Sequence, residues 1–147
     1  MTLPHLARIA YASATRCGVT ADELGELLST WRDHNAARAV TGFLLYHRES
    51  VFQVLEGSSD IIQALYSAIA HDRRHHFVAK LIDEPLAERS FADWPMGYPR
   101  VVHSDLAALG TLRPFLDPAF CYWHCDSAMA RDLIEAFTTG PWRRALD

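Results

Sequence analysis

The chain has 147 residues, of which half are hydrophobic and 22% are charged, and its formal net charge is −4 with histidine neutral. This length and composition fit one globular domain with a core of ordinary size. The acidic balance argues against nucleic acid or an anionic membrane surface as a partner. We expect a cytoplasmic protein, because no apolar run approaches the roughly 20 residues that span a bilayer and the N-terminus lacks secretory features.

The cysteines exclude a complete disulfide framework, because there are only three of them, at Cys17, Cys121 and Cys125. The run from Cys121 to Cys125 would suit part of a metal site, but a second ligand pair at the usual spacing is missing. We therefore expect ordinary thiols and no bound metal.

Residues 4–98 alternate between short apolar runs and amphipathic segments. Five strands are expected, at Leu6–Ala12, Val40–Tyr46, Val51–Glu56, Phe77–Ile82 and Phe91–Tyr98. The second and third form a hairpin through His47–Ser50, and Pro95 makes the fifth an edge strand.

Two helices separate these strands. The first begins at a capping box, Thr20 to Glu23, and ends near His34 or Asn35. The second follows a turn and cap at Gly57–Asp60, carries its apolar side between Ile61 and Ile69, and is closed by Asp72–His76. The order βαββαββ predicts an α+β, ferredoxin-like sandwich, with a five-stranded mixed sheet and two helices on one face. In that plan the first and third strands are central neighbours.

Residues 99–147 follow a different pattern and form a C-terminal helical extension. Short helical pieces are expected at Asp105–Leu109 and Pro114–Leu116. A last helix is capped by Asp126 or Ser127 and ends before Gly140-Pro141. Its apolar residues are Met129, Leu133, Ile134 and Phe137. We expect the extension to pack on the free face of the sheet or to mediate oligomerisation.

Two large polar residues interrupt apolar strands: Tyr11 in the first strand and Gln53 in the third. If these strands are neighbours, both side chains can point under the helices and meet. Their groups must then be hydrogen-bonded, because an unpaired buried polar group costs about 1–3 kcal/mol. One interpretation is a mutually satisfied pair in an ordinary core. The other is a pocket for a polar, aromatic ligand, to which Asn35 adds an amide unless it merely ends its helix in left-handed geometry.

Two further groups have an ordinary and a functional interpretation. Asp72–His76 is either a solvated run that ends a helix or a source of Arg or His contacts to a ligand. Trp94 and Met96 are two residues apart, so on a strand they share a face, either in the core or against a cofactor.

Six segments, taken in order, resemble the BLUF family of blue-light sensors that use FAD, across roughly Pro4 to Tyr98. They are Ile9-Ala10-Tyr11-Ala12-Ser13, His34-Asn35-Ala36, Thr41-Gly42-Phe43-Leu44-Leu45-Tyr46, Phe52-Gln53-Val54-Leu55-Glu56-Gly57, Asp72-Arg73-Arg74-His75 and Phe91-Ala92-Asp93-Trp94-Pro95-Met96. One departure is the turn at His47–Ser50, which lacks the glycine common in the family and puts the hairpin's shape in doubt.

The resemblance implies a role for each matching residue. Tyr11 would be the photoactive tyrosine and Gln53 the glutamine that switches. Flavin contacts would come from these two and from His34, Asn35, Asp72, Arg74 and His75, with Arg73 an alternative donor to Arg74. Trp94 and Met96 would be the fifth-strand pair that responds to light. FAD is the expected cofactor, with FMN and riboflavin as alternatives, because no glycine-rich phosphate motif selects among them.

The resemblance thus implies a photoreceptor and not an enzyme. Light would draw an electron and a proton from Tyr11, and Gln53 would rearrange its hydrogen bonds by rotating or tautomerising. The signal would pass through the fifth strand and the C-terminal helices to an unknown protein partner or to a change of homo-oligomer. The alternatives are a small flavin-dependent enzyme and a light-blind interaction module on the same fold.

Overall fold

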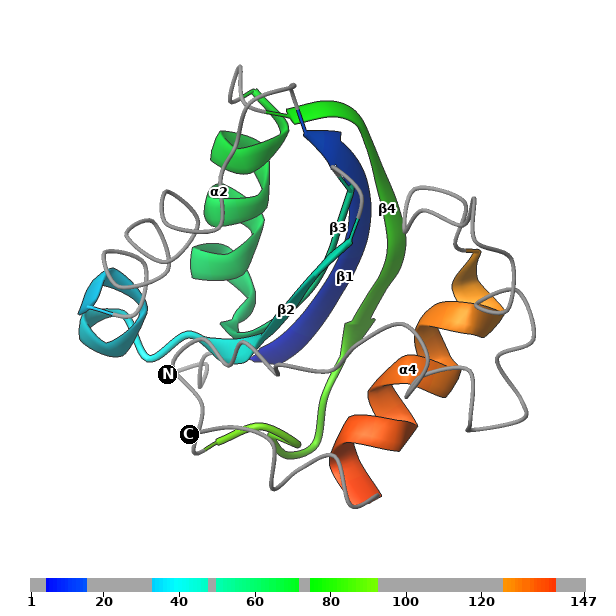
Figure 1. Cartoon of the computed structure of the whole chain (residues 1–147). Helices are drawn as coiled ribbons and strands as arrows, with labels where there is room; N and C mark the ends of the chain where they lie inside the picture. Colours follow the sequence, from blue (N-terminus) through cyan, green and yellow to red (C-terminus); the bar gives the residue numbers. More distant parts are fainter. Residues whose placement is uncertain (1–4, 16–32, 48–49, 72–74, 93–125, 140–147) are drawn as a thin grey trace.

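The computed structural model describes residues 5–15, 33–47, 50–71, 75–92 and 126–139. These residues contain four strands and two labelled helices (Figure 1). In chain order they are β1 (Leu6–Thr15), β2 (Thr41–His47), β3 (Ser50–Ser58), α2 (Ser59–Ala70), β4 (His75–Pro85) and α4 (Ser127–Thr139). Neither labelled helix is long and apolar enough to cross a membrane.

The four strands form one sheet in the order β2-β3-β1-β4. This is the ferredoxin-like order, and it confirms that the first and third strands are central neighbours. Every described pairing is antiparallel. The predicted mixed sheet therefore depends on a fifth strand at Phe91–Tyr98, most of which lies outside the described residues. Phe91 and Ala92 themselves are not in a strand.

Three of the predicted strands were too short, and the second was displaced by one residue, because ladder pairing draws polar residues into the strands. β1 continues past Ala12 to Thr15, and β4 runs from His75 to Pro85 instead of from Phe77 to Ile82. A bulge in β4 opposite Ser13 accommodates Phe77, whose φ of 51° turns an 82% exposed ring outward.

The turn predicted at Gly57–Asp60 was wrong. Gly57 pairs with Ala7, and Ser58 pairs with Leu6, so both belong to β3, and α2 begins immediately at Ser59. Ser58 is the N-cap residue, but its side chain makes no capping hydrogen bond. α2 ends at Ala70, before the charged run that was expected to close it.

The first predicted helix ends later than expected. Residues 33–37 are helical and lie on the same side of the sheet as α2 (Figure 1). The helix closes with a Schellman motif, in which Val40 donates its N–H to Asn35 O at 2.9 Å and Ala39 donates to Ala36 O at 3.3 Å. The left-handed residue is Ala39, with φ 55°, and not Asn35. Residues 20–32 lie outside the described residues.

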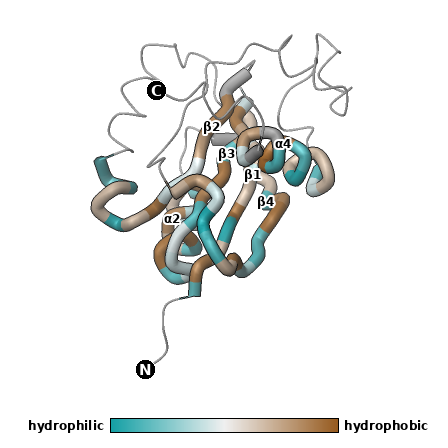
Figure 2. The backbone as a smooth tube through the Cα atoms, turned by 90° about the horizontal axis from the view of Figure 1, so that it is seen from below, coloured by the Kyte–Doolittle hydropathy of each residue, from teal (hydrophilic) through white to brown (hydrophobic). Residues whose placement is uncertain are grey.

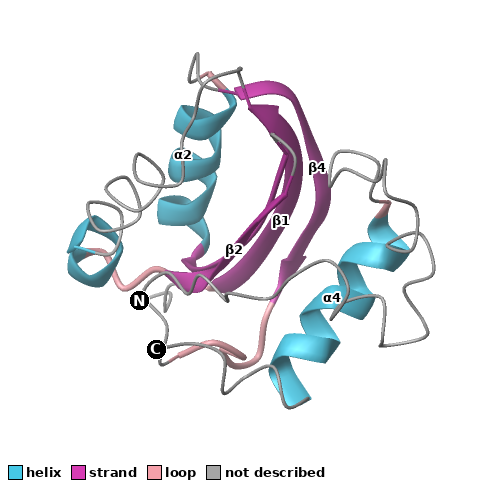
Figure 3. Cartoon of the chain, viewed as in Figure 1, coloured by secondary structure: helices cyan, strands magenta, loops and turns pink. Residues whose placement is uncertain are grey.

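Helices cover both faces of the sheet, with α2 and α4 on opposite sides (Figure 3). One apolar cluster joins α2 to β1, β2 and β3 and includes Ile9, Leu44, Leu55 and Ile62. The other joins α4 to the opposite face and includes Phe43, Phe52, Leu133 and Phe137. This double coverage explains why both faces of β3 are buried. Figure 2 shows hydrophobic stretches along the strands, interrupted by hydrophilic residues.

The last helix matches its prediction closely. Asp126 is its cap, because Oδ1 accepts a hydrogen bond from the N–H of Met129 at 2.9 Å. Ser127, the alternative cap, instead donates its hydroxyl to Leu81 O at 2.9 Å and so ties the helix start to β4. Leu133, Ile134 and Phe137 are buried against the sheet, and Met129 packs beside them. The pieces expected at 105–109 and 114–116 lie outside the described residues.

Candidate functional site

Tyr11 and Gln53 meet at the centre of the sheet. They are direct partners in the antiparallel ladder between β1 and β3, so their side chains share a face. The Tyr11 hydroxyl donates a hydrogen bond to Oε1 of Gln53. Both residues are almost fully buried, with 1% and 3% of their surfaces exposed. The predicted meeting of these two side chains is confirmed.

The pair lies on the face that α2 covers. Gln53 pairs with Tyr11 of β1 on one side and with Leu44 of β2 on the other. These three side chains therefore lie next to one another across three neighbouring strands. Tyr11 also contacts the ring of Tyr66 from α2 edge-on, with 5.8 Å between centroids. Lys80 Nζ lies over the same Tyr66 ring, 5.0 Å from its centre, as in a cation–π contact. A phenol and a carboxamide are thus held within an otherwise apolar layer.

The two residues at the end of the first helix differ in environment. Asn35 is buried, with 3% of its surface exposed, whereas His34 is exposed. Asn35 sits one turn before the helix end, where its backbone carbonyl accepts the closing bond from Val40. Asn35 therefore belongs to a helical segment that lies on the same side of the sheet as α2 (Figure 1).

The other predicted site residues cannot be placed as fully. Asp72, Arg73, Arg74, Trp94 and Met96 lie outside the described residues. His75 is the first residue of β4 and pairs with Thr15. The three cysteines also lie outside the described ranges, and within those ranges no cluster of His, Cys, Asp and Glu could hold a metal ion.

The hydrogen bond between Tyr11 and Gln53 defines what this pair can do. Tyr11 donates, so the carboxamide meets the phenol with its acceptor end. The two ends of a carboxamide differ chemically, and rotation or tautomerisation would exchange a donor for an acceptor. A change in the charge or protonation of the phenol would favour such an exchange. The pair can therefore store a hydrogen-bonding change without forming a covalent bond.

This layer also suits a flavin ring. A flat aromatic cofactor requires apolar surroundings and a few placed polar groups. The α2 face of the sheet supplies both, because the polar groups of Tyr11, Ser13 and Gln53 are buried there among aliphatic side chains. The buried Asn35 belongs to the helical segment on the same side of the sheet (Figure 1). The donor set therefore fits the expected cofactor.

The opposite face holds a buried charge that the sequence analysis missed. Glu56 has no exposed surface, and its Oε2 accepts hydrogen bonds from Nη2 of Arg8 at 2.8 Å and from Nε at 3.3 Å. Arg8 is its direct ladder partner. The signal in the sequence was a single charged residue in each of two apolar strands, Arg8 in β1 and Glu56 in β3. Tyr11 and Gln53 were noticed for a similar reason, as polar residues in the same strands.

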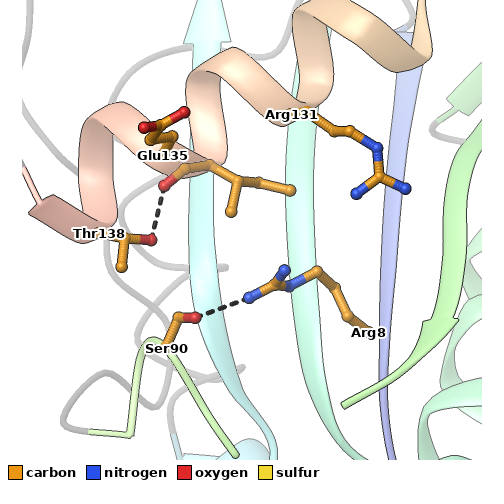
Figure 4. Close-up of a pocket in the computed structure, with 6 residues that line it drawn as sticks. Arg8, Ser90, Arg131, Glu135 and Thr138 are labelled. Atoms are coloured by element: carbon orange, nitrogen blue, oxygen red, sulfur yellow. Dashed lines mark hydrogen bonds between the residues drawn. The ribbon is translucent and has the colours of Figure 1, made fainter. Parts of the chain in front are cut away.

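A pocket of about 250 Å³ adjoins this ion pair (Figure 4). It is lined by Arg8, Ser90, Arg131, Ile134, Glu135 and Thr138. Both of its guanidinium groups are already paired with carboxylates: Arg8 with Glu56 and Glu84, and Arg131 with Glu84. The hydrogen bond that Arg131 donates to Glu84 raises the pKa of Arg131 above its ordinary value. The pocket thus carries no surplus positive charge, and it lies on the face away from Tyr11.

Comparisons with known proteins agree with this geometry. Residues 6–97 match the protein family described as sensors of blue light using FAD, or BLUF. The chain is 32% identical to the photoactivated adenylate cyclase subunit alpha of Euglena gracilis over 96 residues, which are 63% of this chain and 9% of that protein. It is 30% identical over 86 residues to the blue light- and temperature-regulated antirepressor BluF of Escherichia coli K12, covering 58% of this chain and 21% of that protein.

The fold has relatives among solved structures. The photo-activated state of BlsA superposes with a TM-score of 0.76 at 23% sequence identity, covering 92% of this chain and 96% of that one. The structural likeness therefore extends beyond the residues that match the family. By contrast, the chain spans only a small part of the two curated relatives.

Proposed function

The chain belongs to the BLUF family of flavin-binding blue-light sensors, and from this premise we propose that Tyr11 and Gln53 are its light-responsive pair. The observation that carries the proposal is their buried hydrogen bond between central strands. The two residues are only 1% and 3% exposed, so their polar groups are shielded from water. A change in the hydrogen bonding of one group must therefore change the hydrogen bonding of the other.

The proposed cofactor is FAD, held between the sheet and the helices on the α2 face. Asn35 and Gln53 would bind its polar edge, and Tyr11 would lie beside it. His34, Asp72, Arg74 and His75 complete the expected contacts. When bound, FAD supplies a ring that absorbs blue light and is strongly oxidising once excited.

In this proposal Tyr11 gives up an electron together with its hydroxyl proton and later recovers both. Loss of the proton removes the donor that holds Oε1 of Gln53. The carboxamide then changes its hydrogen-bonding pattern, and the new pattern persists after Tyr11 has recovered. Leu44 and the surrounding aliphatic side chains exclude water that would otherwise satisfy either group and erase the change.

The output would be a contact with a protein partner or a change of homo-oligomer, with no catalysis by this chain and no nucleic-acid or membrane partner. The names of two relatives support regulation of other proteins, since one is a photoactivated cyclase subunit and the other an antirepressor. We place the sensor in residues 4–98 and the output in residues 99–147. The packing of α4 on the face opposite α2 supports this division. A cytoplasmic location completes the proposal.

The test is the absorption spectrum of the purified protein with FAD in the dark, after blue light and during recovery. We expect a flavin spectrum that shifts slightly to the red and returns in the dark. Gln53→Leu should bind flavin but lose the shift. Gln63→Leu is the matched control, because it makes the same substitution on α2. The described hydrogen bonds of the Gln63 side chain go to the exposed carboxylate of Asp83.

Three results would overturn the proposal. A red shift retained in Gln53→Leu would exclude Gln53 as the switching residue. A wild-type protein that binds no flavin would favour a light-blind module, and a yellow protein that consumes a substrate would favour an enzyme.

A further inference from the structure

The carboxylate of Glu56 gathers four donors from two parts of the chain. In addition to Arg8, it accepts the N–H of Ser90 at 3.1 Å and the N–H of Phe91 at 2.9 Å. Two consecutive backbone amides thus converge on one ionised side chain, and such charge-assisted bonds are roughly twice as strong as neutral ones. Glu56 therefore fixes the path of the chain at Ser90–Phe91.

A second set of bonds fastens the same segment. The guanidinium of Arg89 donates to the backbone carbonyl of Glu56 at 3.1 Å and to Oγ1 of Thr41 at 2.9 Å. The ring of Phe91 is fully buried and meets Phe43 edge-on, with 4.9 Å between centroids. Residues 89–91 are thus held to both β2 and β3, immediately before the residues expected to carry Trp94 and Met96.

The network of ion pairs extends from Arg8 to α4. Arg8 donates Nη2 to the hydroxyl of Ser90 at 2.8 Å and Nη1 to Glu84 at 3.4 Å. Glu84 also accepts Nη2 of Arg131, on α4, at 2.9 Å. Figure 4 shows Arg8 between Ser90 and the helix that carries Arg131. The ion pairs therefore form a continuous path from β3 through β1 and β4 to α4.

This path is rigidly linked to the proposed light-responsive pair. Tyr11 and Gln53 form one rung of the β1–β3 ladder, and Arg8 and Glu56 form another rung three residues along. Because the separation is odd, the two pairs lie on opposite faces of the sheet. A shift or twist of β3 at Gln53 must therefore move Glu56 on the α4 side.

We propose that Glu56 is a positioning residue that clamps Arg89–Phe91 to the strand carrying Gln53, and that movement of β3 reaches α4 through Arg8 and Glu84. The proposal rests on the light response described above. In this proposal, side chains of the described residues connect the two faces of the sheet, ahead of the residues expected to form a fifth strand. The element with two states is the group of hydrogen bonds at Glu56. In one state Glu56 binds the amides of Ser90 and Phe91, and in the other state it releases them.

The decisive variant is Glu56→Gln, studied in the full chain with FAD bound. It keeps the size of the side chain but replaces a charged acceptor with a neutral one. Glu88→Gln makes the same chemical change at an exposed position two residues from Ser90 and is the matched control. Amide hydrogen exchange in darkness and under blue light is measured beside the absorption spectrum, because exchange reports local opening residue by residue.

In darkness, Glu56→Gln should exchange the Ser90 and Phe91 amides about tenfold faster than wild type, since a neutral acceptor binds them less strongly. Under light, wild type should change the exchange of α4 by at least about threefold, whereas Glu56→Gln should keep the red shift and lose most of that change. Glu88→Gln should match wild type in both respects.

The proposal is overturned if Glu56→Gln keeps the red shift and the full light-dependent change in α4. If that variant does not fold, Arg131→Gln tests the far end of the path at a 58% exposed side chain. It should reduce the change in α4 and leave Ser90, Phe91 and the red shift as in wild type, and an undiminished change again overturns the path. A wild type without a red shift would instead refute the proposed function, while the dark exchange of Ser90 and Phe91 would still test the clamp.

Discussion

Removing the hydrogen bond between Tyr11 and Gln53 should have a distinctive energetic signature. Tyr11→Phe deletes only the hydroxyl, and Gln53→Leu deletes the carboxamide while keeping a similar size. Each single variant leaves the other buried group without the described partner. At 1% and 3% exposure, water cannot readily replace it.

The expected magnitudes follow from this burial. Each single substitution should lower the free energy of unfolding by about 1–3 kcal/mol, because it removes a buried hydrogen bond and leaves the other polar group in place. The double variant replaces both groups with apolar ones and should cost about 1–2 kcal/mol less than the sum of the singles. A cost of 1.5 kcal/mol corresponds to a drop of about 1 M in the urea midpoint.

The assay is urea unfolding in the dark at two concentrations of excess FAD. Comparing the two concentrations separates the intrinsic cost from weaker cofactor binding, since bound ligand stabilises the folded state in proportion to the logarithm of its concentration. If the free-energy changes of the two single variants simply add, within about 0.5 kcal/mol, the two groups do not interact energetically and the reasoning fails.

Three further changes test the backbone and the surface. Gly42→Ala should destabilise the protein by about 3 kcal/mol or more in chemical unfolding. The reason is that a Cβ at φ 147° would lie 1.8 Å from the carbonyl oxygen of Val54. A loss of stability below about 1 kcal/mol would contradict this reasoning. Ala39→Gly should raise the thermal midpoint slightly, since relief of left-handed strain of about 1–2 kcal/mol exceeds the entropic cost of glycine of about 0.5–1 kcal/mol. A hydrogen bond from Lys80 lowers the pKa of Asp83 below its ordinary 3.8, so its stabilisation is present above that pH and is lost as pH falls through the lowered value. Asp83→Asn should therefore cost about 0.3 kcal/mol at pH 7 and nothing at strongly acid pH, as urea unfolding at both would show.

The sequence predicted the meeting of Tyr11 and Gln53 better than it predicted the element boundaries. Tyr11 and Gln53 stood out because each is a large polar residue in an apolar strand, and burial makes such residues pair. The observed strand ends differ from the predicted ones because a strand ends where its neighbouring strands stop pairing with it. Gly57 and Ser58 have turn-like identities, yet Ala7 and Leu6 opposite them extend the ladder.

Asn35 and Glu56 show the limits of local patterns. An asparagine near a helix end suggests a left-handed cap, but here Ala39 takes that conformation and Asn35 is buried one turn earlier. Glu56 was visible only as part of a motif. Its partners lie 48 residues before it, at Arg8, and 34 and 35 residues after it, at Ser90 and Phe91.

The sequence by itself therefore determined the family, the ferredoxin-like strand order and the two residues that we propose as the light-responsive pair. These follow from ordered motifs and from hydrophobic periodicity, which act over a few residues at a time. Only the tertiary structure decided that Tyr11 faces Gln53 in register, that α4 covers the opposite face, and that Glu56 holds Ser90 and Phe91 there. The physical reason is that register, face and ion pairing depend on which distant segments pack together, and chain-local patterns do not contain that information.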